Sequence, residues 1–328
     1  MPAQLSIVIV NWRSKDFLRR CLVTVRETCA DLVTQIVVVD GGSFDGCGDM
    51  LAAEFPAVEF VQSPENVGFG RSNNLGFSQV IGEAVLLLNP DTELKPGAVQ
   101  RLLDELNARP DAGILGPRLL NADGTLQKSS VMALPTPLNQ ALRSEFLMRL
   151  LPNSRLWGAG EAFRATEPVV VEAVSGACML MRSEVFRRLE GFRPDYFMYA
   201  EDMDLCFRVR RLGLAVYHVP QAEVLHHGGG SSRTQVNQFS LQMMRVANHT
   251  YMRLNHGRAT ARNYRALQAL SALTRMLLVL PVCLLGRGAR RTQAWMTWNS
   301  WRLVLKWSCN PTTATIIASP RPKPDLCP

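Results

Sequence analysis

Several common signatures are missing from this 328-residue sequence, and each absence argues against a class of protein. The eight cysteines form no C-x-x-C pair and no regular spacing, so neither a zinc ribbon nor a disulfide framework is indicated. No Gly-x-x-x-x-Gly-Lys-Ser/Thr loop occurs, and no G-x-G-x-x-G lies in the first crossover. A P-loop nucleotidase and a dehydrogenase are therefore not supported. We expect buried, reduced thiols in a cytosolic protein.

An export signal and a membrane span are also not evident. Residues 1–12 (MPAQLSIVIVNW) have no basic region and no cleavage site, and their apolar run is typical of a strand. The longest uncharged apolar run near the other end covers residues 276–286, whereas a membrane span needs about 20 apolar residues. We therefore expect a cytoplasmic protein in which this run is too short to cross a membrane.

Positive charge exceeds negative charge, with 36 Lys and Arg against 28 Asp and Glu and a net charge of +8. This balance favours anionic partners: nucleic acid, anionic lipid or phosphorylated small molecules. Because no recognised nucleic-acid-binding motif accompanies the charge, we expect no nucleic-acid partner.

The first half of the chain alternates apolar, β-rich runs with helical patterns. Such alternation predicts an α/β fold with a mostly parallel sheet flanked by helices. Ligands of these sheets bind at the carboxyl ends of the strands, where Asp40 and Asp91 both fall. The expected strands cover 5–11, 35–40, 58–63 and 84–91, and the expected helices 15–29, 71–82 and 96–109.

The second half changes character twice. Residues 118–170 are irregular, residues 169–181 resume strand character, and residues 214–232 read as two short strands. Residues 239–307 look helical throughout. We therefore expect a nucleotide-binding catalytic domain over 1–235 and a helical C-terminal region over 236–328.

The helical region includes a segment rich in tryptophan. Trp295, Trp298 and Trp301 recur at helical spacing, and basic residues surround them. Trp prefers the lipid–water interface, and a basic amphipathic helix can lie in the headgroup plane. This pattern favours peripheral association with the inner face of the cell membrane. An ordinary packed helix and a homodimer contact are the alternatives.

Three polar groups follow strands or precede a glycine-rich turn. Asp40, Ser43 and Asp45 suit a ribose or base, or alternatively a turn closed by local Asx bonds. Asp91, in the sequence Asn89-Pro90-Asp91, suits a hard cation such as Mg²⁺ or Mn²⁺, or alternatively a helix N-cap. His226, before the glycines at 228–230, suits a metal shell or a structural role.

The stretch FMYAEDMDLCFRVRRLG, residues 197–213, places three acids behind an aromatic patch. One interpretation is a helix start, where the macrodipole favours acids and would lower the pKa of Asp202. The other is a reactive carboxylate. In either case we expect Asp204 to pair with Arg208 one helical turn later.

Eight stretches together resemble the family 2 glycosyltransferases, in the rhamnosyltransferase-like branch that builds bacterial surface polysaccharides. They occur in the family's order over about residues 5–232: SIVIVNW, VVVDGGSFDG, ENVGFGRSNNLG, LLLNPDTEL, PRLLNADGTLQKS, SGACMLMRSEVFRRLEGF, FMYAEDMDLCFRVRRLG and VLHHGGGSS. The resemblance implies a GT-A-type, Rossmann-like fold. One departure is Gly41, where the family usually has Asn.

The resemblance also implies roles for individual residues. Asp202 would be the catalytic base, with Glu201 beside it, and Asp91 and His226 would hold a divalent Mg²⁺ or Mn²⁺. Glu201, Tyr199 and Arg208 would contact the acceptor. The nucleoside-diphosphate sugar would lie against Asn11, Asp40, Ser43, Asp45, Asn66, Gly68, Asn73 and Asn89.

The expected activity is inverting, metal-dependent transfer of one sugar to a glycan or lipid-linked acceptor. The branch suggests rhamnose from dTDP-rhamnose, or another sugar from a UDP-sugar. Processive synthases carry a Q-x-x-R-W element that is absent here, and a nucleotidyltransferase would need a glycine-rich loop after the first strand. A non-catalytic nucleotide-sugar-binding scaffold subunit is the alternative function.

Overall fold

A computed structural model describes residues 4–151, 154–157, 160–228 and 238–310 of the chain. By its internal contacts the chain divides into two compact units. The first, called here the sheet unit, comprises Met1–Leu134 and Pro152–Gln235. The second, called the helical unit, comprises Pro135–Leu151 and Val236–Pro328. The segment 135–151 therefore groups with the C-terminal helices, and the predicted boundary at 235/236 stays a prediction.

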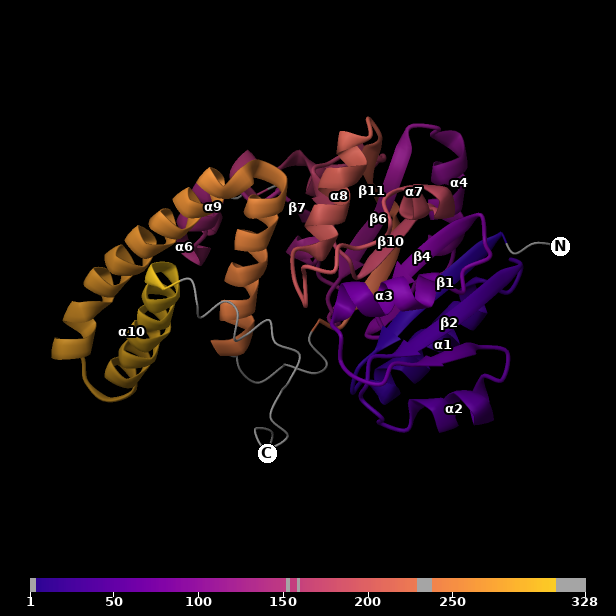
Figure 1. The fold of residues 1–328 in the computed structure, drawn as a ribbon, viewed down its shortest axis with the longest axis horizontal. Helices are drawn as coiled ribbons and strands as arrows, with labels where there is room; N and C mark the ends of the chain where they lie inside the picture. The colour runs from indigo at the N-terminus through magenta and orange to yellow at the C-terminus, as the bar shows by residue number, and fades with distance from the viewer. Residues whose placement is uncertain (1–3, 152–153, 158–159, 229–237, 311–328) are drawn as a thin grey trace. The chain divides into compact units, whose positions relative to one another are not determined.

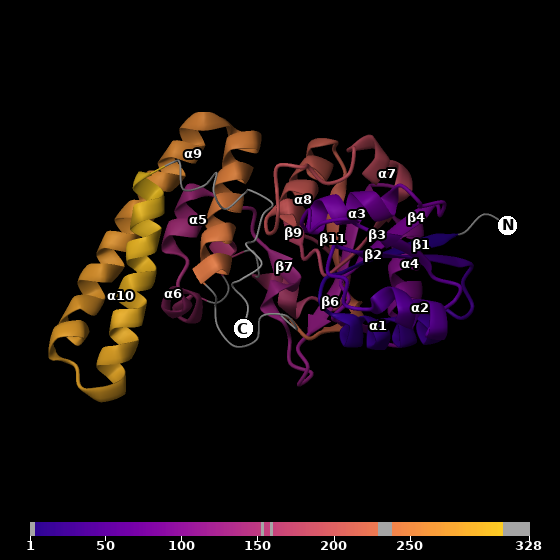
Figure 2. The same cartoon turned by 60° about the horizontal axis from the view of Figure 1, so that its bottom comes forward.

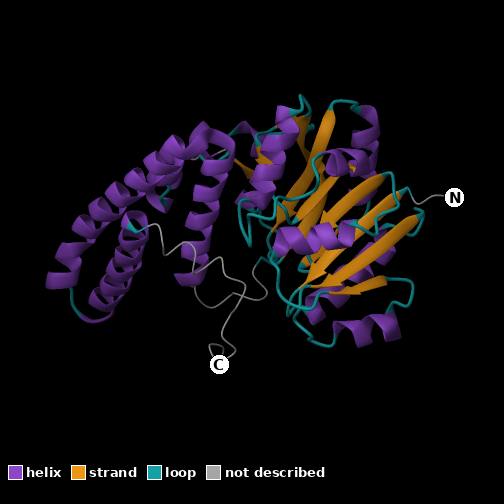
Figure 3. Ribbon diagram, viewed as in Figure 1, coloured by secondary structure: helices purple, strands orange, loops and turns teal. Residues whose placement is uncertain are grey.

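The sheet unit is built on a nine-stranded sheet in the order β3-β2-β1-β4-β10-β6-β11-β5, with β8 paired to β11 (Figure 3). β7 and β9 form a separate pair. The strands are β1 (Leu5–Asn11), β2 (Thr34–Asp40), β3 (Glu59–Gln62), β4 (Ala84–Leu88), β5 (Thr92–Leu94), β6 (Ala112–Leu120), β7 (Val131–Met132), β8 (Val169–Val170), β9 (Ala173–Val174), β10 (Cys178–Arg182) and β11 (Ala215–His226).

Helices cover both faces of this sheet, because its central strands are apolar on both sides. One core joins α1, α2 and α4 to β1 through Leu5, Ile7 and Ile9. The other joins α7 and α8 to the opposite side of the sheet, with Phe69 and Phe77 of α3 packed against it. The helices are α1 (Lys15–Thr28), α2 (Cys47–Glu54), α3 (Phe69–Phe77), α4 (Ala98–Ala108), α7 (Ser183–Arg188) and α8 (Glu201–Arg211) (Figure 1).

The predicted α/β architecture with flanking helices is confirmed, but the sheet is mixed. β1 pairs in parallel with β2 and β4, as expected, whereas β10 runs antiparallel to β4 and β6. The expectation of two short strands over 214–232 was wrong. Pro220 has no N–H to donate, and the ladder between β11 and β6 shifts register between Val219 and Glu223, yet the strand continues to His226.

The helical unit contains α5 (Pro137–Leu142), α6 (Glu145–Leu150), α9 (Gln238–Leu285) and α10 (Gly288–Cys309), as Figure 2 shows. This confirms the helical character predicted for residues 239–307. Gly257, with a φ of 88°, breaks α9 into two helical segments. The capping box of Thr136 and Asn139 starts α5, where Pro137 fits the first helical turn.

The apolar run at 276–286 is part of a longer apolar stretch than the sequence reading assumed. Among the described residues, one helical stretch, Ser240–Leu285, contains an 18-residue window of mean hydropathy 1.8, with 22% of the window buried. By length and composition it could cross a membrane, because the helix continues on the N-terminal side of the run. The expectation that the run at 276–286 is by itself too short to cross a membrane stays a prediction.

Candidate active site

Two glycines let three loops of the sheet unit approach one another. Gly42 has a φ of 77°, and a Cβ there would lie 2.4 Å from the backbone carbon of Glu65. Gly68 has a φ of 89°, and a Cβ there would lie 2.1 Å from the carbonyl oxygen of Phe197. The amide of Phe69 donates to that same oxygen at 3.0 Å. The loops after β2, after β3 and before α8 are thus held together, backbone against backbone.

Asp40, at the end of β2, is fully buried and organises the turn that follows it. Its Oδ2 accepts the amides of Ser43 at 3.0 Å and Phe44 at 2.9 Å, and the side-chain amide of Gln62 at 2.8 Å. Burial alone would raise the pKa of Asp40, but these donors, with the Ser43 hydroxyl and Asn11, outweigh burial and lower it. Asp40 is therefore an ionised carboxylate that shapes the turn, and its contact with a nucleoside stays a prediction.

Asn11 joins Asp40 to Asp45. Its side-chain nitrogen donates to Asp40 Oδ1 at 3.1 Å and to both oxygens of Asp45 at 3.2 Å. Its side-chain oxygen is buried without a partner among the described residues, so it can accept a hydrogen bond from a ligand. A Cβ on Gly41 would lie 3.3 Å from the Asn11 carbonyl oxygen, which leaves little room for the Asn usual in the family.

Asp40, Asp45 and Cys47 offer ligand atoms within 4.8 Å of one another, a spacing that could hold a metal ion. Two observations argue against that use. The Asn11 amide already donates to both carboxylates. Burial and the two neighbouring carboxylates raise the pKa of Cys47 to about 12, so its thiol keeps its proton and is a poor ligand.

Two of the remaining predicted donor-binding residues form local side-chain hydrogen bonds, and the third does not. Asn66 Oδ1 accepts the amide of Gly68 at 3.0 Å and closes the turn. Asn73 is buried and donates to the Phe69 carbonyl oxygen one turn earlier in α3. Asn89 Oδ1 is buried without a partner among the described residues, a second acceptor that a ligand could use.

Asp91 and His226 come together where β5 and β11 pair. His226 Nε2 lies 3.3 Å from Asp91 Oδ1, and both side chains are mostly buried. His226 Nδ1 lies 2.7 Å from Gln127 Oε1. The Gln127 amide nitrogen faces the oxygens of Asn121 and of the His226 backbone, which fixes Oε1 toward the ring. Nδ1 therefore carries a proton, which it donates to Gln127, and Nε2 faces Asp91 Oδ1.

This geometry fits a divalent cation. Two acceptor atoms 3.3 Å apart repel each other unless a proton or a cation lies between them. Metal-ligating histidines commonly donate their other ring N–H to an oxygen, as His226 does to Gln127. The neighbouring His227 instead directs its Nε2 to Glu93 Oε1 at 2.8 Å. Of the glycines at 228–230 that follow this pair, those at 229 and 230 lie outside the described residues.

The acid cluster begins after two residues in an uncommon backbone conformation. Tyr199 and Ala200 have φ of 71° and 61°, in the left-handed region that non-glycine residues rarely adopt. The N-cap of α8 is Ala200, with no side-chain cap. Asp202 Oδ2 accepts the amide of Gly176 at 3.0 Å, and its Oδ1 accepts that of Met203 at 2.8 Å. The start of α8 is thus strained and held by a neighbouring loop.

Burial governs the electrostatics of the two acids. It raises the pKa of Glu201, which the negative charge of Asp202 raises further, and it raises the pKa of Asp202 despite the two amides. The prediction of a lowered pKa for Asp202 was wrong, because the helix dipole does not compensate for the loss of water around the pair. Glu201 Oε2 is buried without a partner among the described residues, which favours the protonated form.

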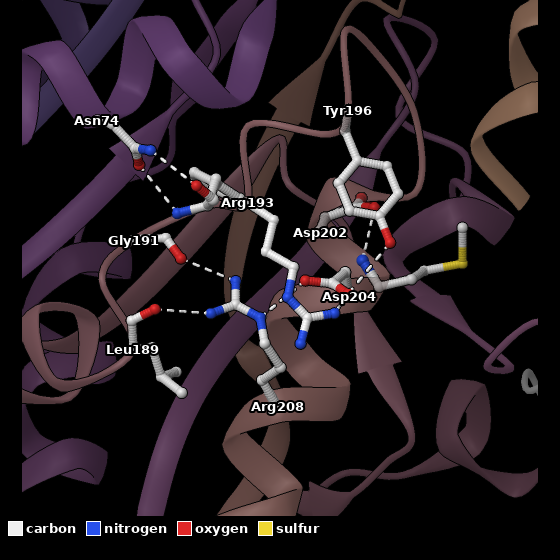
Figure 4. Close-up of polar contacts among 10 residues, drawn as sticks. Asn74, Leu189, Gly191, Arg193, Tyr196, Asp202, Asp204 and Arg208 are labelled. Atoms are coloured by element: carbon white, nitrogen blue, oxygen red, sulfur yellow. Dashed lines mark hydrogen bonds and ion pairs between the residues drawn. The ribbon is translucent and has the colours of Figure 1, made fainter. Parts of the chain in front are cut away.

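The predicted pairing of Asp204 with Arg208 is confirmed at 2.7 Å (Figure 4). Fully buried Asp204 also accepts from Arg193 at 3.0 Å and from the Tyr196 hydroxyl at 3.1 Å. Arg208 donates to the carbonyl oxygens of Leu189 and Gly191 and is 10% exposed. These contacts brace the loop before α8 and leave Arg208 little surface for the acceptor contact expected of it.

Three contributors to the site were missed at the sequence level. Gln127 orients His226, and Gly176 holds Asp202. Asn74 pairs its side-chain amide with both the N–H and the carbonyl of Phe192, anchoring the loop before α8 (Figure 4). All three lie inside stretches that carried the family resemblance, and that position was the available signal.

A mixed α/β sheet with flanking helices, and with polar groups gathered at its strand ends, has the architecture of GT-A glycosyltransferases. The profile of the family described as "Glycosyl transferase family 2" matches residues 6–189, and the chain belongs to this family. It is accordingly a glycosyltransferase.

Relatives support the rhamnosyltransferase-like branch. The chain is 29% identical over 245 residues to the N-acetylglucosaminyl-diphospho-decaprenol L-rhamnosyltransferase of Mycobacterium tuberculosis, covering 71% of this chain and 78% of the relative. It is 23% identical over 239 residues to rhamnosyltransferase WbbL of Escherichia coli strain K12, covering 70% and 85%.

Solved structures share the fold. The mannosyltransferase PcManGT from Pyrobaculum calidifontis, in complex with GDP-Man and Mn²⁺, aligns with a TM-score of 0.56 at 16% identity, covering 94% of this chain and 89% of that one. GalNAc-T7 with UDP, GalNAc and Mn²⁺ aligns with a TM-score of 0.57 at 15% identity, covering 89% and 55%. Both of these structures contain Mn²⁺.

Proposed function

We propose that this glycosyltransferase transfers a single sugar, with inversion, from a nucleoside-diphosphate sugar to a lipid-linked glycan acceptor, and that the transfer depends on a divalent cation. One juxtaposition carries the proposal. The turn at Gly176–Ala177 contacts both the candidate base and the candidate metal loop. Its Gly176 amide donates to Asp202, and its Ala177 carbonyl accepts the Asn89 amide.

Asp91 and His226 are the proposed ligands of Mg²⁺ or Mn²⁺. A bound divalent cation would stabilise the negative charge of the departing nucleoside diphosphate. Gln127 would keep His226 in the tautomer that binds metal. Asn11 and Asn89 would offer their unpartnered side-chain oxygens to N–H or O–H groups of the donor.

Asp202 is the proposed general base. The amides of Gly176 and Met203 fix its carboxylate, and they favour the ionised form against the effect of burial. The acceptor hydroxyl would pass its proton to Asp202 as its oxygen attacks the sugar. Glu201 keeps its own proton at neutral pH, and it would position the base or the acceptor hydroxyl. Tyr199, partly exposed, would contribute to the acceptor side.

The names of the relatives support rhamnose as the first choice of sugar, with dTDP-rhamnose as donor and a UDP-sugar as the alternative. The name of the mycobacterial relative includes a decaprenyl diphosphate carrier. By analogy we propose a lipid-linked acceptor, reached from the cytoplasmic face of the membrane through the helical unit.

The test is thermal protection by a panel of nucleotide sugars with and without Mn²⁺. A ligand at 100 times its dissociation constant stabilises the folded state by about 2.7 kcal/mol. We expect dTDP-rhamnose or a UDP-sugar to protect the protein only with Mn²⁺ present, and to release its nucleoside diphosphate when lipid extract is added. Protection without turnover on any extract would instead indicate a non-catalytic binding subunit.

A further inference from the structure

The charge of the chain is concentrated in the two long C-terminal helices. Residues 238–309 contain eleven Lys and Arg and no Asp or Glu. The rest of the chain contains 25 Lys and Arg and 28 Asp and Glu, so it is slightly acidic. The net positive charge of the protein therefore comes entirely from α9 and α10, which cannot neutralise their cations internally.

Three of the arginines of the helical unit gather around two aromatic rings. The guanidinium groups of Arg275 and Arg245 lie over the ring of Trp301, at 4.3 and 5.4 Å from its centroid. Tyr264 is fully buried nearby. Burial raises the pKa of Tyr264 to about 12, and the charges of Arg245 and Arg143 oppose that rise. Arg143, Arg245 and Arg275 are called the arginine cluster below.

No carboxylate balances this cluster among the described side chains. Arg275 donates to the carbonyl oxygens of Arg143 and Ala141, where α5 ends, and Arg245 donates to that of Leu241. The Nε of Arg245 is buried without a partner in the described part of the chain. Burial and the charge of Arg245 lower the pKa of Arg275. Like charges held together with unused N–H groups are costly, and a bound anion removes that cost.

The surface of the helical unit is also unusually apolar. Of the twenty large hydrophobic residues that are exposed in the described structure, fourteen belong to this unit. Leu277 and Leu278, close to Arg275 in α9, are 68% and 73% exposed. This surface combines exposed apolar side chains with positive charge and no negative charge. Such a surface suits an anionic bilayer, because the acyl chains of the lipids accommodate the apolar side chains and the lipid phosphates bind the cations.

We propose that the arginine cluster binds the phosphate group of an anionic membrane lipid while the neighbouring leucines enter the acyl region. The guanidinium groups supply paired N–H donors in the planar geometry that phosphate oxygens accept. Trp301 keeps two of the guanidiniums in place. This inference rests on the membrane association within the proposed function, but it assigns that association to a defined site.

The experiment is co-sedimentation of the full-length protein with phosphatidylcholine vesicles that contain or lack phosphatidylglycerol. Arg143→Gln/Arg245→Gln is compared with Arg258→Gln/Arg262→Gln, a pair of exposed arginines of α9 outside the cluster. Both variants lose two positive charges. The loss of non-specific attraction, about fivefold in vesicle affinity per residue, should therefore weaken the binding of both variants equally. We expect the cluster variant to bind phosphatidylglycerol vesicles at least tenfold more weakly than its charge-matched control.

Arg143→Gln alone is the second variant, because the Arg143 side chain forms no hydrogen bond within the part of the chain that the structure describes. Arg258→Gln is its control. If the cluster variants bind vesicles as well as their controls, for the double and for the single substitutions alike, the proposed lipid site is wrong, although the protein still associates with membranes. If the wild type does not prefer vesicles that contain phosphatidylglycerol, both the lipid site and the association with anionic membranes are wrong. Inorganic diphosphate that binds to the cluster and does not compete with vesicles would identify a soluble anion as its ligand and contradict the lipid assignment.

Discussion

In the sheet unit, several carboxylates are buried, whereas α9 and α10 of the helical unit contain no carboxylate at all. Asp40, Glu201 and Asp204 are each less than 10% exposed, and each stands at a strand end or a helix start. The helical unit places its arginines against aromatic rings and backbone carbonyls instead. In the proposed function, the sheet unit would present negative groups to a cation and to a hydroxyl proton, and the helical unit would present cations to an anionic partner.

The difference lies in how each unit satisfies its buried charges. Asp40 and Asp204 have several protein donors each, so they are fully compensated and serve the architecture. Glu201 Oε2, by contrast, is buried without a partner in the described part of the chain, and His226 Nε2 lies against the Asp91 carboxylate, an arrangement suited to groups that bind a ligand or a proton. The positive charges of the arginine cluster likewise have no carboxylate partner among the described side chains.

The largest expected effect concerns Asp202. Asp202→Asn keeps the size of the side chain and an oxygen for the Gly176 amide, but it cannot take a proton. Transfer of labelled sugar from the nucleotide donor to lipid extract should fall about 100-fold or more, with donor affinity unchanged. Glu201→Gln should have a milder effect, because Glu201 already carries its proton. Near-normal transfer by Asp202→Asn with none by Glu201→Gln would reassign the base to Glu201.

The next effect concerns Gln127. Gln127→Leu removes the acceptor for His226 Nδ1, so the ring loses the bond that fixes its tautomer, and the affinity for Mn²⁺ should fall about 10- to 100-fold. Gln127→Glu retains an acceptor oxygen and should keep most of the affinity. Titration of nucleotide-loaded protein with Mn²⁺, followed by electron paramagnetic resonance, measures this directly. His227→Ala is the control, and an equal loss in it would remove the distinction between the two histidines.

A smaller effect should appear in the pH dependence of stability. Burial and Asp202 raise the pKa of Glu201 from 4.5 to about 8, so the folded state holds this proton more tightly than the unfolded state. The contribution of Glu201 is therefore most favourable below pH 4.5 and is lost as the pH rises to about 8. Urea unfolding should show Glu201→Gln losing less stability than the wild type over this window, by about 1 kcal/mol or more. Parallel pH profiles would contradict a protonated Glu201.

Local patterns in the sequence predicted much of the fold. The apolar run at 5–11 became β1 with the same bounds, and the four-residue spacing of Asp204 and Arg208 predicted their ion pair. The mixed character of the sheet was harder to predict, because the direction of a strand depends on pairing partners that are far away in the sequence. β6 escaped notice because Gly113, Gly116 and Pro117 interrupt its apolar pattern.

Site residues that belong to a recognised motif could be predicted from the sequence. Properties that depend on contacts with residues far away in the sequence could not. Asp91 and His226 could be paired in advance by resemblance, but Gln127 reaches His226 across 99 positions of sequence. The raised pKa of Asp202 follows from burial, which no helix-start rule contains. The apolar helix surface was underestimated because the run at 276–286 was judged without the turns before it.

We propose, in short, that the donor binds to the sheet unit and that lipid binds to the helical unit. The most direct test measures thermal protection by dTDP and by UDP with Mn²⁺ in two variants, Asp91→Asn and Arg143→Gln/Arg245→Gln. We expect the arginine variant to keep wild-type protection by whichever nucleotide protects the wild type, and Asp91→Asn to lose that protection. Protection retained by Asp91→Asn, or lost by the arginine variant while it remains folded, would contradict this division.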